Sequence, residues 1–187
     1  MGWPMRLFTG ISLAPNVVDG LSALLAELKP TATVKWSPIS NLPITCKFIG
    51  VWPEDRLAEL KTALSTVRAA GPIPIAISGL GFFSNSFFAR VQAGPALSEL
   101  ATAINRSLLP LGCQPETRAF HPHVTLARVK PGSDLRTVRR HIAAMTGFDL
   151  GSFAAREFHL YLSQPGPQGS VYTKLATYDL VREKNTI

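Results

Sequence analysis

The sequence predicts an α+β protein in which antiparallel or mixed sheets, with helices outside them, surround a central cleft. Strand and helix patterns alternate along the 187 residues, and hairpin signals recur among them. Two short strand sequences also resemble each other at a separation of nearly half the chain. The glycine-rich motifs of dinucleotide-binding and P-loop proteins are absent, which argues against a doubly wound nucleotide fold. We therefore expect a single domain over residues 1–187, made of two intertwined, pseudo-twofold lobes.

The first part of the chain has the pattern strand, helix, strand, helix. Pro15 in a first turn and Pro30 beyond the last turn are typical bounds of a helix. Gly50 is expected to end the second strand. Apolar residues at helical spacing from Leu57 to Val67 predict the second helix. The expected ranges are strands 5–13 and 43–49 and helices 15–28 and 54–69.

The second part begins with a hairpin, because two runs typical of strands are separated only by Ser84-Asn85. A helix with a leucine- and isoleucine-rich face follows, and then a strand. Ser133-Asp134 is a typical start of the next helix, and the last two strands flank a turn rich in proline and glycine. The expected ranges are strands 73–83, 86–93, 119–129, 153–163 and 171–181, and helices 95–109 and 133–145.

Composition narrows the class of protein. Apolar residues make up 46% of the chain and charged residues 17%, so the chain can fill a core. The formal net charge of +7 suits an anionic partner such as nucleic acid or a nucleotide, although a generally basic soluble protein is the alternative. The sequence has no apolar run that could span a membrane and no secretory signal pattern. Cys46 and Cys113 fit neither a disulfide scaffold nor a zinc site, so we expect reduced thiols in a cytoplasmic monomer.

The two similar strands carry the polar side chains of most interest. Alternate side chains of a strand share a face, so each strand should have one polar face and one apolar face. The two threonines concerned are 80 residues apart, which suggests two similar halves with a cleft between them. The expected polar faces are His121, His123 and Thr125 on one strand and Pro43, Thr45 and Lys47 on the other.

The second of these strands holds the motif His123-Val124-Thr125-Leu126, and the first reads Pro43-Ile44-Thr45-Cys46 with its flanks intact. They resemble the paired His-x-Thr/Ser-x motifs of the 2H phosphoesterase superfamily, specifically the bacterial 2'-5' RNA ligase-like RNA 2',3'-cyclic phosphodiesterases. Residues 6–11, 158–163 and 172–175 also resemble that family. The resemblance covers residues 5–181.

The resemblance implies a phosphodiesterase, independent of metals and cofactors, that opens 2',3'-cyclic phosphates of RNA ends or nucleotides to 2'-phosphomonoesters. Two histidines on opposite sides of the phosphorus can act as base and acid, because imidazole titrates near neutral pH. By this resemblance, His123 is one catalytic residue and Pro43 stands at the position of the other. Thr45 and Thr125 are the expected phosphate contacts. The regiochemistry of the product is implied by the family alone.

Pro43 departs from the family pattern, because proline has neither an acid nor a base. It also lacks a backbone donor, which confines it to a strand start, an edge or a bulge. Three interpretations follow: a weak enzyme that uses His123 alone, an enzyme that has recruited another group, or a nucleotide- or RNA-binding module without turnover. An interaction domain with no ligand is a further alternative. His121 is the nearest substitute, but it lies about 7 Å along the strand and on the wrong lobe.

Further residues are candidate substrate contacts, each with a plainer alternative. Lys47 shares the face of the first threonine and can meet an anion, or it is a solvated lysine. Arg128 falls on the opposite parity at a strand end, where it contacts substrate or forms a surface ion pair. His121 contacts a phosphate tail at the cleft rim or faces solvent, and Phe8 is an aromatic wall for a base or a core residue. The basic helical stretch around His141 is a solvated face or an RNA-backbone contact.

Overall fold

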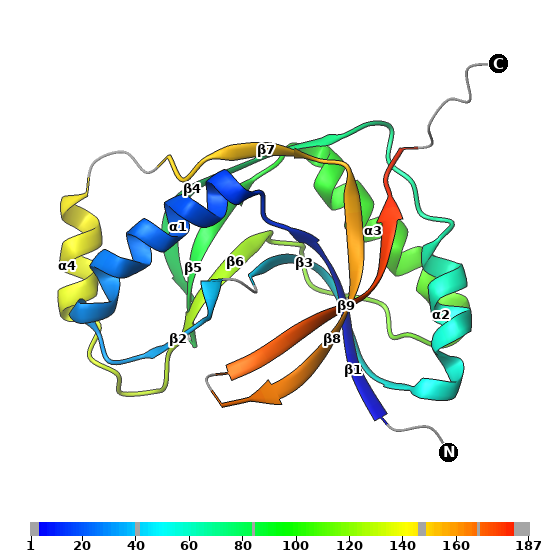
Figure 1. Ribbon diagram of the computed structural model, residues 1–187, viewed down its shortest axis with the longest axis horizontal. Coiled ribbons are helices and arrows are strands. Elements are labelled where there is room, and N and C mark those ends of the chain that lie inside the picture. The colour runs from blue at the N-terminus through cyan, green and yellow to red at the C-terminus, as the bar shows by residue number, and fades with distance from the viewer. Residues whose placement is uncertain (1–3, 40–41, 84, 146–148, 168, 182–187) are drawn as a thin grey trace.

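Two antiparallel sheets form the centre of the molecule, and the helices lie outside them (Figure 1). The computed structural model describes residues 4–39, 42–83, 85–145, 149–167 and 169–181. The strands within these ranges are β1 (Pro4–Ser12), β2 (Lys35–Trp36), β3 (Pro43–Pro53), β4 (Ile73–Phe83), β5 (Ser86–Gln92), β6 (His123–Arg128), β7 (Ser152–Ala155), β8 (Glu157–Gly166) and β9 (Gly169–Asp179). The helices are α1 (Pro15–Leu28), α2 (Leu57–Leu64), α3 (Pro95–Leu108) and α4 (Arg136–Ala144). The predicted α+β class is confirmed.

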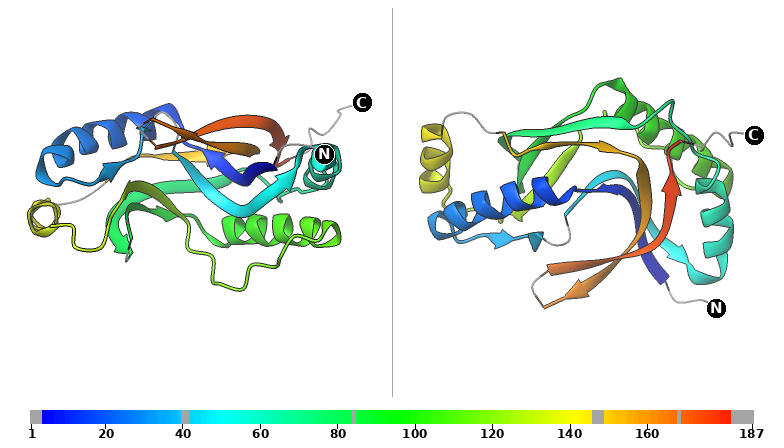
Figure 2. Two further views of the ribbon diagram at one scale, coloured as in Figure 1. Left: turned by 90° about the horizontal axis from the view of Figure 1, so that it is seen from below. Right: turned by 45° about the horizontal axis from the view of Figure 1, so that its top comes forward.

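The chain repeats its order of elements at an interval of 80 residues. α1 and α3 each have 14 residues, begin at a proline and run into a 3-10 turn, Lys29–Thr31 and Leu109–Leu111 respectively. A strand precedes each of these helices, β1 or β5, and a motif strand follows it, β3 or β6. α2 and α4 come after the motif strands and lie at opposite ends of the molecule (Figure 2).

Matching apolar faces hold the two repeated helices against the core. Proline at the first position has its φ set for a helix and lacks only an N–H that a first turn leaves unpaired. Burying each leucine or isoleucine contributes about 1.5–3 kcal/mol. None of the helices in the described ranges is long and apolar enough to cross a bilayer. The buried residues are Val17, Leu21, Leu24, Leu25 and Leu28 in α1, and Leu97, Leu100, Ala101, Ile104 and Leu108 in α3.

Strand exchange joins the two halves. Among the described strands, one sheet has the order β3-β1-β8-β9 and the other β2-β6-β5-β4-β7. β4 belongs to the first half of the chain but pairs with β5, whereas β8 belongs to the second half but pairs with β1. Each sheet is therefore built from both halves, and the motif strands β3 and β6 contact each other between them.

Several predicted boundaries are wrong in the first half. β3 does not end at Gly50 but continues to Pro53, because Gly50 adopts a φ of +88° at a register shift beside β1. A glycine tolerates that backbone conformation without strain. The helix expected over 54–69 is shorter, since a 3-10 turn, Glu54–Arg56, comes before α2. The short strand β2 was not predicted.

Boundaries also differ in the second half. The strand expected over 119–129 begins only at His123, because Pro122 has no N–H to donate to a ladder. The helix expected from Ser133 begins at Arg136, whose N–H donates to the carboxylate of Asp134 at 2.9 Å. The last two expected strands are three in the structure, because β7 pairs with β4 in one sheet and β8 with β1 in the other.

Candidate active site

A pocket of about 170 Å³ lies where the motif strands meet, and both strands line it. Thr45 from β3 and Thr125 from β6 lie there together, with Pro43 and His123 at the first positions of the same strands. The structure thus brings together the four motif residues that were expected to share a cleft. The lining residues in the described ranges are Lys35, Trp36, Ser37, Pro38, Leu42, Pro43, Thr45, Phe48, His123, Thr125, Arg128, Gly169, Ser170 and Tyr172.

Both motif strands contain a bulge directly after their threonine. In β3 the register with β1 skips Cys46, and in β6 the register with β5 skips Leu126. A bulged residue reverses the faces of all residues that follow it. The six residues from Pro43 and from His123 accordingly have the same burial pattern, and the last residue of each, Phe48 or Arg128, lines the pocket.

The bulge overturns the predicted face of Arg128. Simple alternation places it on the side opposite Thr125, but the structure places both in the pocket. Arg128 is also the register partner of Lys35 on β2. The lining residues therefore include two cations side by side and no carboxylate among the described ones. This arrangement suits an anionic ligand.

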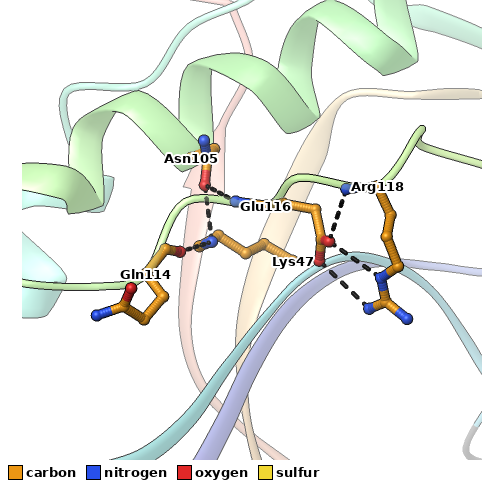
Figure 3. Close-up of polar contacts among 5 residues, drawn as sticks. All are labelled: Lys47, Asn105, Gln114, Glu116 and Arg118. Carbon is orange, nitrogen blue, oxygen red and sulfur yellow. Dashed lines mark hydrogen bonds and ion pairs between the residues drawn. The ribbon is translucent and has the colours of Figure 1, made fainter.

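The same bulge makes the prediction for Lys47 wrong. Lys47 points away from the pocket and is only 6% exposed. Its Nζ donates hydrogen bonds to Oδ1 of Asn105 at 2.7 Å and to the carbonyl oxygen of Gln114 at 2.9 Å (Figure 3). The ammonium group therefore fastens β3 to α3 and to the loop after it.

This contact continues toward the second motif strand. Oδ1 of Asn105 also accepts the N–H of Glu116 at 3.2 Å, and the Glu116 carboxylate binds Arg118 (Figure 3). The hydrogen bonds from Arg118 lower the pKa of Glu116. Because residues 114–118 lead into β6, Lys47 ties the first motif strand to the approach of the second.

His123 is held in one orientation. Its Nδ1 lies 2.8 Å from the carbonyl oxygen of His121, which can only accept, so Nδ1 donates and Nε2 is left for chemistry. The imidazole also makes T-shaped contacts with the rings of Phe83 and Phe88. The centroids of these rings lie 5.4 and 5.5 Å from the imidazole centroid. Two aromatic rings and one backbone acceptor thus fix the imidazole that the motif supplies.

Gly81 makes room for this aromatic support. A Cβ at Gly81 would lie 2.5 Å from the Phe88 ring, closer than atoms can pack. Gly79, two residues earlier, has a φ of +73° at the register shift between β4 and β5. The Gly79-Leu80-Gly81 segment is therefore a bend in a strand that brings backbone close to the ring beside His123.

Pro43 lies at the start of β3, an edge strand, opposite Ser12 of β1. Such a position tolerates proline. Pro43, Leu42 and Tyr172 also line a second pocket of about 340 Å³, which Tyr161 and Lys174 border. The site therefore borders further space beside Pro43.

The remaining predicted contacts lie outside the main pocket. His121 is exposed, precedes the strand and lines a neighbouring groove with Phe83 and Arg90, which adjoins the main pocket at His123. Phe8 is 3% exposed and stacks on Tyr161 with ring centroids 5.0 Å apart. The aromatic surface in the pocket instead comes from residues that alternation did not reveal: Trp36, Phe48 and Tyr172.

Two buried groups near the site are not reactive. Burial raises the pKa of the Cys46 thiol to about 12, so it stays protonated. Burial, with a smaller effect of Lys174, lowers the pKa of His159 to about 4. Nδ1 of His159 bonds to Oγ1 of Thr177 at 3.0 Å, while its Nε2 lies 3.5 Å from Glu157 without hydrogen-bond geometry. His159 is thus a neutral core residue.

Known proteins resemble this chain along most of its length. The RNA 2',3'-cyclic phosphodiesterase of Methanothermobacter thermautotrophicus is 28% identical over 183 residues, which cover 94% of this chain and 99% of the relative. That of Methanocaldococcus jannaschii is 31% identical over 172 residues, covering 90% and 96%. Among solved structures, Escherichia coli LigT complexed with 3'-AMP has a TM-score of 0.78 at 22% identity, covering 96% of this chain and 100% of LigT, a likeness of fold alone. A protein of Thermus thermophilus has a TM-score of 0.78 at 26% identity, covering 94% and 98%.

Two repeated motif strands thus present threonines to one cationic pocket, on a fold shared with LigT. The family model of the 2'-5' RNA ligase superfamily matches residues 17–166. The chain belongs to that superfamily.

Proposed function

We propose that the protein is an RNA 2',3'-cyclic phosphodiesterase that yields 2'-phosphomonoesters. The observation that carries this proposal is the convergence of His123, Thr45 and Thr125 in one pocket that also holds Lys35 and Arg128. The activity named for relatives that match at least nine-tenths of the chain agrees with it.

Each group has a role that its chemistry allows. The hydroxyls of Thr45 and Thr125 donate to the two non-bridging oxygens of the cyclic phosphate. Lys35 and Arg128 balance the negative charge that grows as water attacks phosphorus. Nε2 of His123 transfers the proton on its side of the phosphorus, either from the attacking water or to the departing 3'-oxygen. The bond between phosphorus and O3' breaks, and the phosphate stays on O2'.

Because position 43 holds a proline, no side chain at this position can act as acid or base on the opposite side of the phosphorus. Solvent then has to move that proton, at a loss of about 10²–10⁴-fold relative to a positioned group. The chain is in this view a slow enzyme. Because the chemistry needs no metal, turnover should persist in a chelator.

Turnover of adenosine 2',3'-cyclic phosphate tests the proposal. The purified protein should form adenosine 2'-phosphate above the uncatalysed rate, and His123→Ala should abolish the excess. His141→Ala is the matched control, because His141 lies on α4 and outside the pocket lining. Equal rates for the protein and for His123→Ala would refute the proposal.

Pro43 also favours a second candidate, a nucleotide- or RNA-binding protein without turnover. Its signature would be saturable binding of the cyclic nucleotide, weakened by Thr45→Val, with no product after prolonged incubation. For the cell compartment we propose the cytoplasm, because Cys46 and Cys113 are both free thiols buried in the structure.

A further inference from the structure

The two repeated halves carry very different charge after their motif strands. Residues 128–141, from Arg128 through most of α4, hold five Lys or Arg residues and one carboxylate, a net charge of +4 out of the chain's +7. The equivalent residues 48–61, which lead from Phe48 into α2, hold two cations and three carboxylates, a net charge of −1. α2 and α4 lie at opposite ends of the molecule, so the basic stretch and its acidic counterpart are far apart (Figure 2).

The basic charge on α4 is exposed and mostly not neutralised. Arg136, Arg139 and Arg140 are all exposed. Arg136 pairs with Asp134 at 2.8 Å, whereas Arg139 and Arg140 form no ion pair among the described residues. The other carboxylate at this helix, Glu27 of α1, lies 3.9 Å from His141.

Two connections lead from the pocket to α4, one along the chain and one through packed aromatic rings. Arg128 lines the pocket at the end of β6, and the chain runs from it through Lys130 to α4. A second connection runs through aromatic rings from Trp36, which lines the pocket, to Phe87 and Phe82 and then to the guanidinium of Arg139. Successive groups on that path are 6.0, 4.7 and 4.1 Å apart. The Phe82 ring thus helps to hold Arg139 in place.

We propose that the α4 surface, made of Arg128, Lys130, Arg139 and Arg140, binds the phosphodiester backbone of RNA upstream of the end held in the pocket. This inference rests on the proposed function, because a 2',3'-cyclic phosphate occurs only at a 3' end. The rest of the strand must then leave the pocket on one side. The charge of this stretch assigns that exit to the α4 end, and an oligonucleotide is the preferred substrate over a free cyclic nucleotide.

Binding of oligonucleotides of increasing length tests the inference without any turnover. The probes are RNAs of one, four and eight nucleotides that carry a terminal 2'-phosphate, so the protein cannot consume them. The octamer should bind roughly tenfold more tightly than the mononucleotide at low salt, with a steeper salt dependence. Arg139→Gln/Arg140→Gln should remove most of that gain and lower the salt slope by about 1.4, because each single-strand phosphate contact contributes about 0.7. Mononucleotide affinity should not change.

The matched control is Lys61→Gln/Arg106→Gln, which removes the same charge from α2 and α3 at the other end. The inference is overturned if this control weakens the octamer equally, or if the octamer binds no more tightly than the mononucleotide. It is also overturned if Arg139→Gln/Arg140→Gln leaves the octamer unaffected but abolishes binding to vesicles of anionic phospholipid. A failure of the proposed function would appear separately, as absence of turnover with length-dependent binding intact.

Discussion

At the scale of single residues, Thr45 and Thr125 are the equivalent threonines of the two motif strands. They occupy the same position in two strands with the same burial pattern, so each should hold one oxygen of the same phosphate. Thr45→Val and Thr125→Val should each lower kcat/KM by about 10- to 150-fold, since a hydrogen bond to a charged group contributes about 1.5–3 kcal/mol. Steady-state kinetics on the cyclic nucleotide measure both. Thr62→Val, whose hydroxyl bonds only within α2, is the control, and a loss confined to one of the two motif threonines would contradict the symmetry.

His159 gives the pH dependence of stability. Its pKa is about 4 in the fold and 6.5 when unperturbed, so the unfolded chain binds its proton more readily. The free energy of unfolding is therefore highest above about pH 6.5. It decreases as pH falls toward 4, by about 3 kcal/mol in total. Urea unfolding at pH 7.5 and pH 4.5 should show the decline, and His159→Gln should remove part of it. An identical pH dependence in the variant would contradict a buried, neutral imidazole.

At the scale of elements, Gly81 of β4 makes room for the Phe88 ring of β5, which packs against His123. Gly81→Ala places a methyl against that ring, which must shift together with the His123 imidazole it contacts. We expect a lower kcat with a stability loss of about 1–3 kcal/mol. Gly71→Ala is the control, because nothing lies within 4 Å of the added Cβ there. An unchanged kcat in Gly81→Ala would show that Phe88 does not position His123.

The motif strands also show how far alternation predicts a site. It predicts correctly that Thr125 and His123 share a face, because no irregularity separates them. Alternation fails beyond Cys46 and Leu126, because a bulge depends on pairing with a neighbouring strand. The pattern of residues within one strand does not reveal it. Lys47 was therefore assigned to the pocket and Phe48 to the other face, the reverse of the structure.

At the scale of the whole molecule, the repeat was visible in the sequence and the strand exchange was not. The proline-bounded helices and the paired motifs recur at a fixed interval, so their order follows from local patterns. Which sheet β4 or β8 joins depends on long-range pairing, because a strand pattern is the same whichever partner it finds. The sequence does not predict the short β2, because two residues are too few to show an alternating pattern. β2 nevertheless brings Lys35 beside Arg128.

The proposed site has two sides, with His123 and position 43 on opposite sides of one phosphate, and Pro43 supplies no acid or base on its side. Turnover of a 2',3'-cyclic nucleotide by Pro43→His, compared with the unaltered chain, measures this directly. We predict a rise in kcat of about 10²–10⁴-fold with a much smaller change in KM, because a general acid or base acts mainly in the transition state. His123→Ala in the Pro43→His background should remove that gain. A rate that Pro43→His cannot improve, or a gain that survives His123→Ala, would contradict the assignment of these two positions to opposite sides of one phosphate.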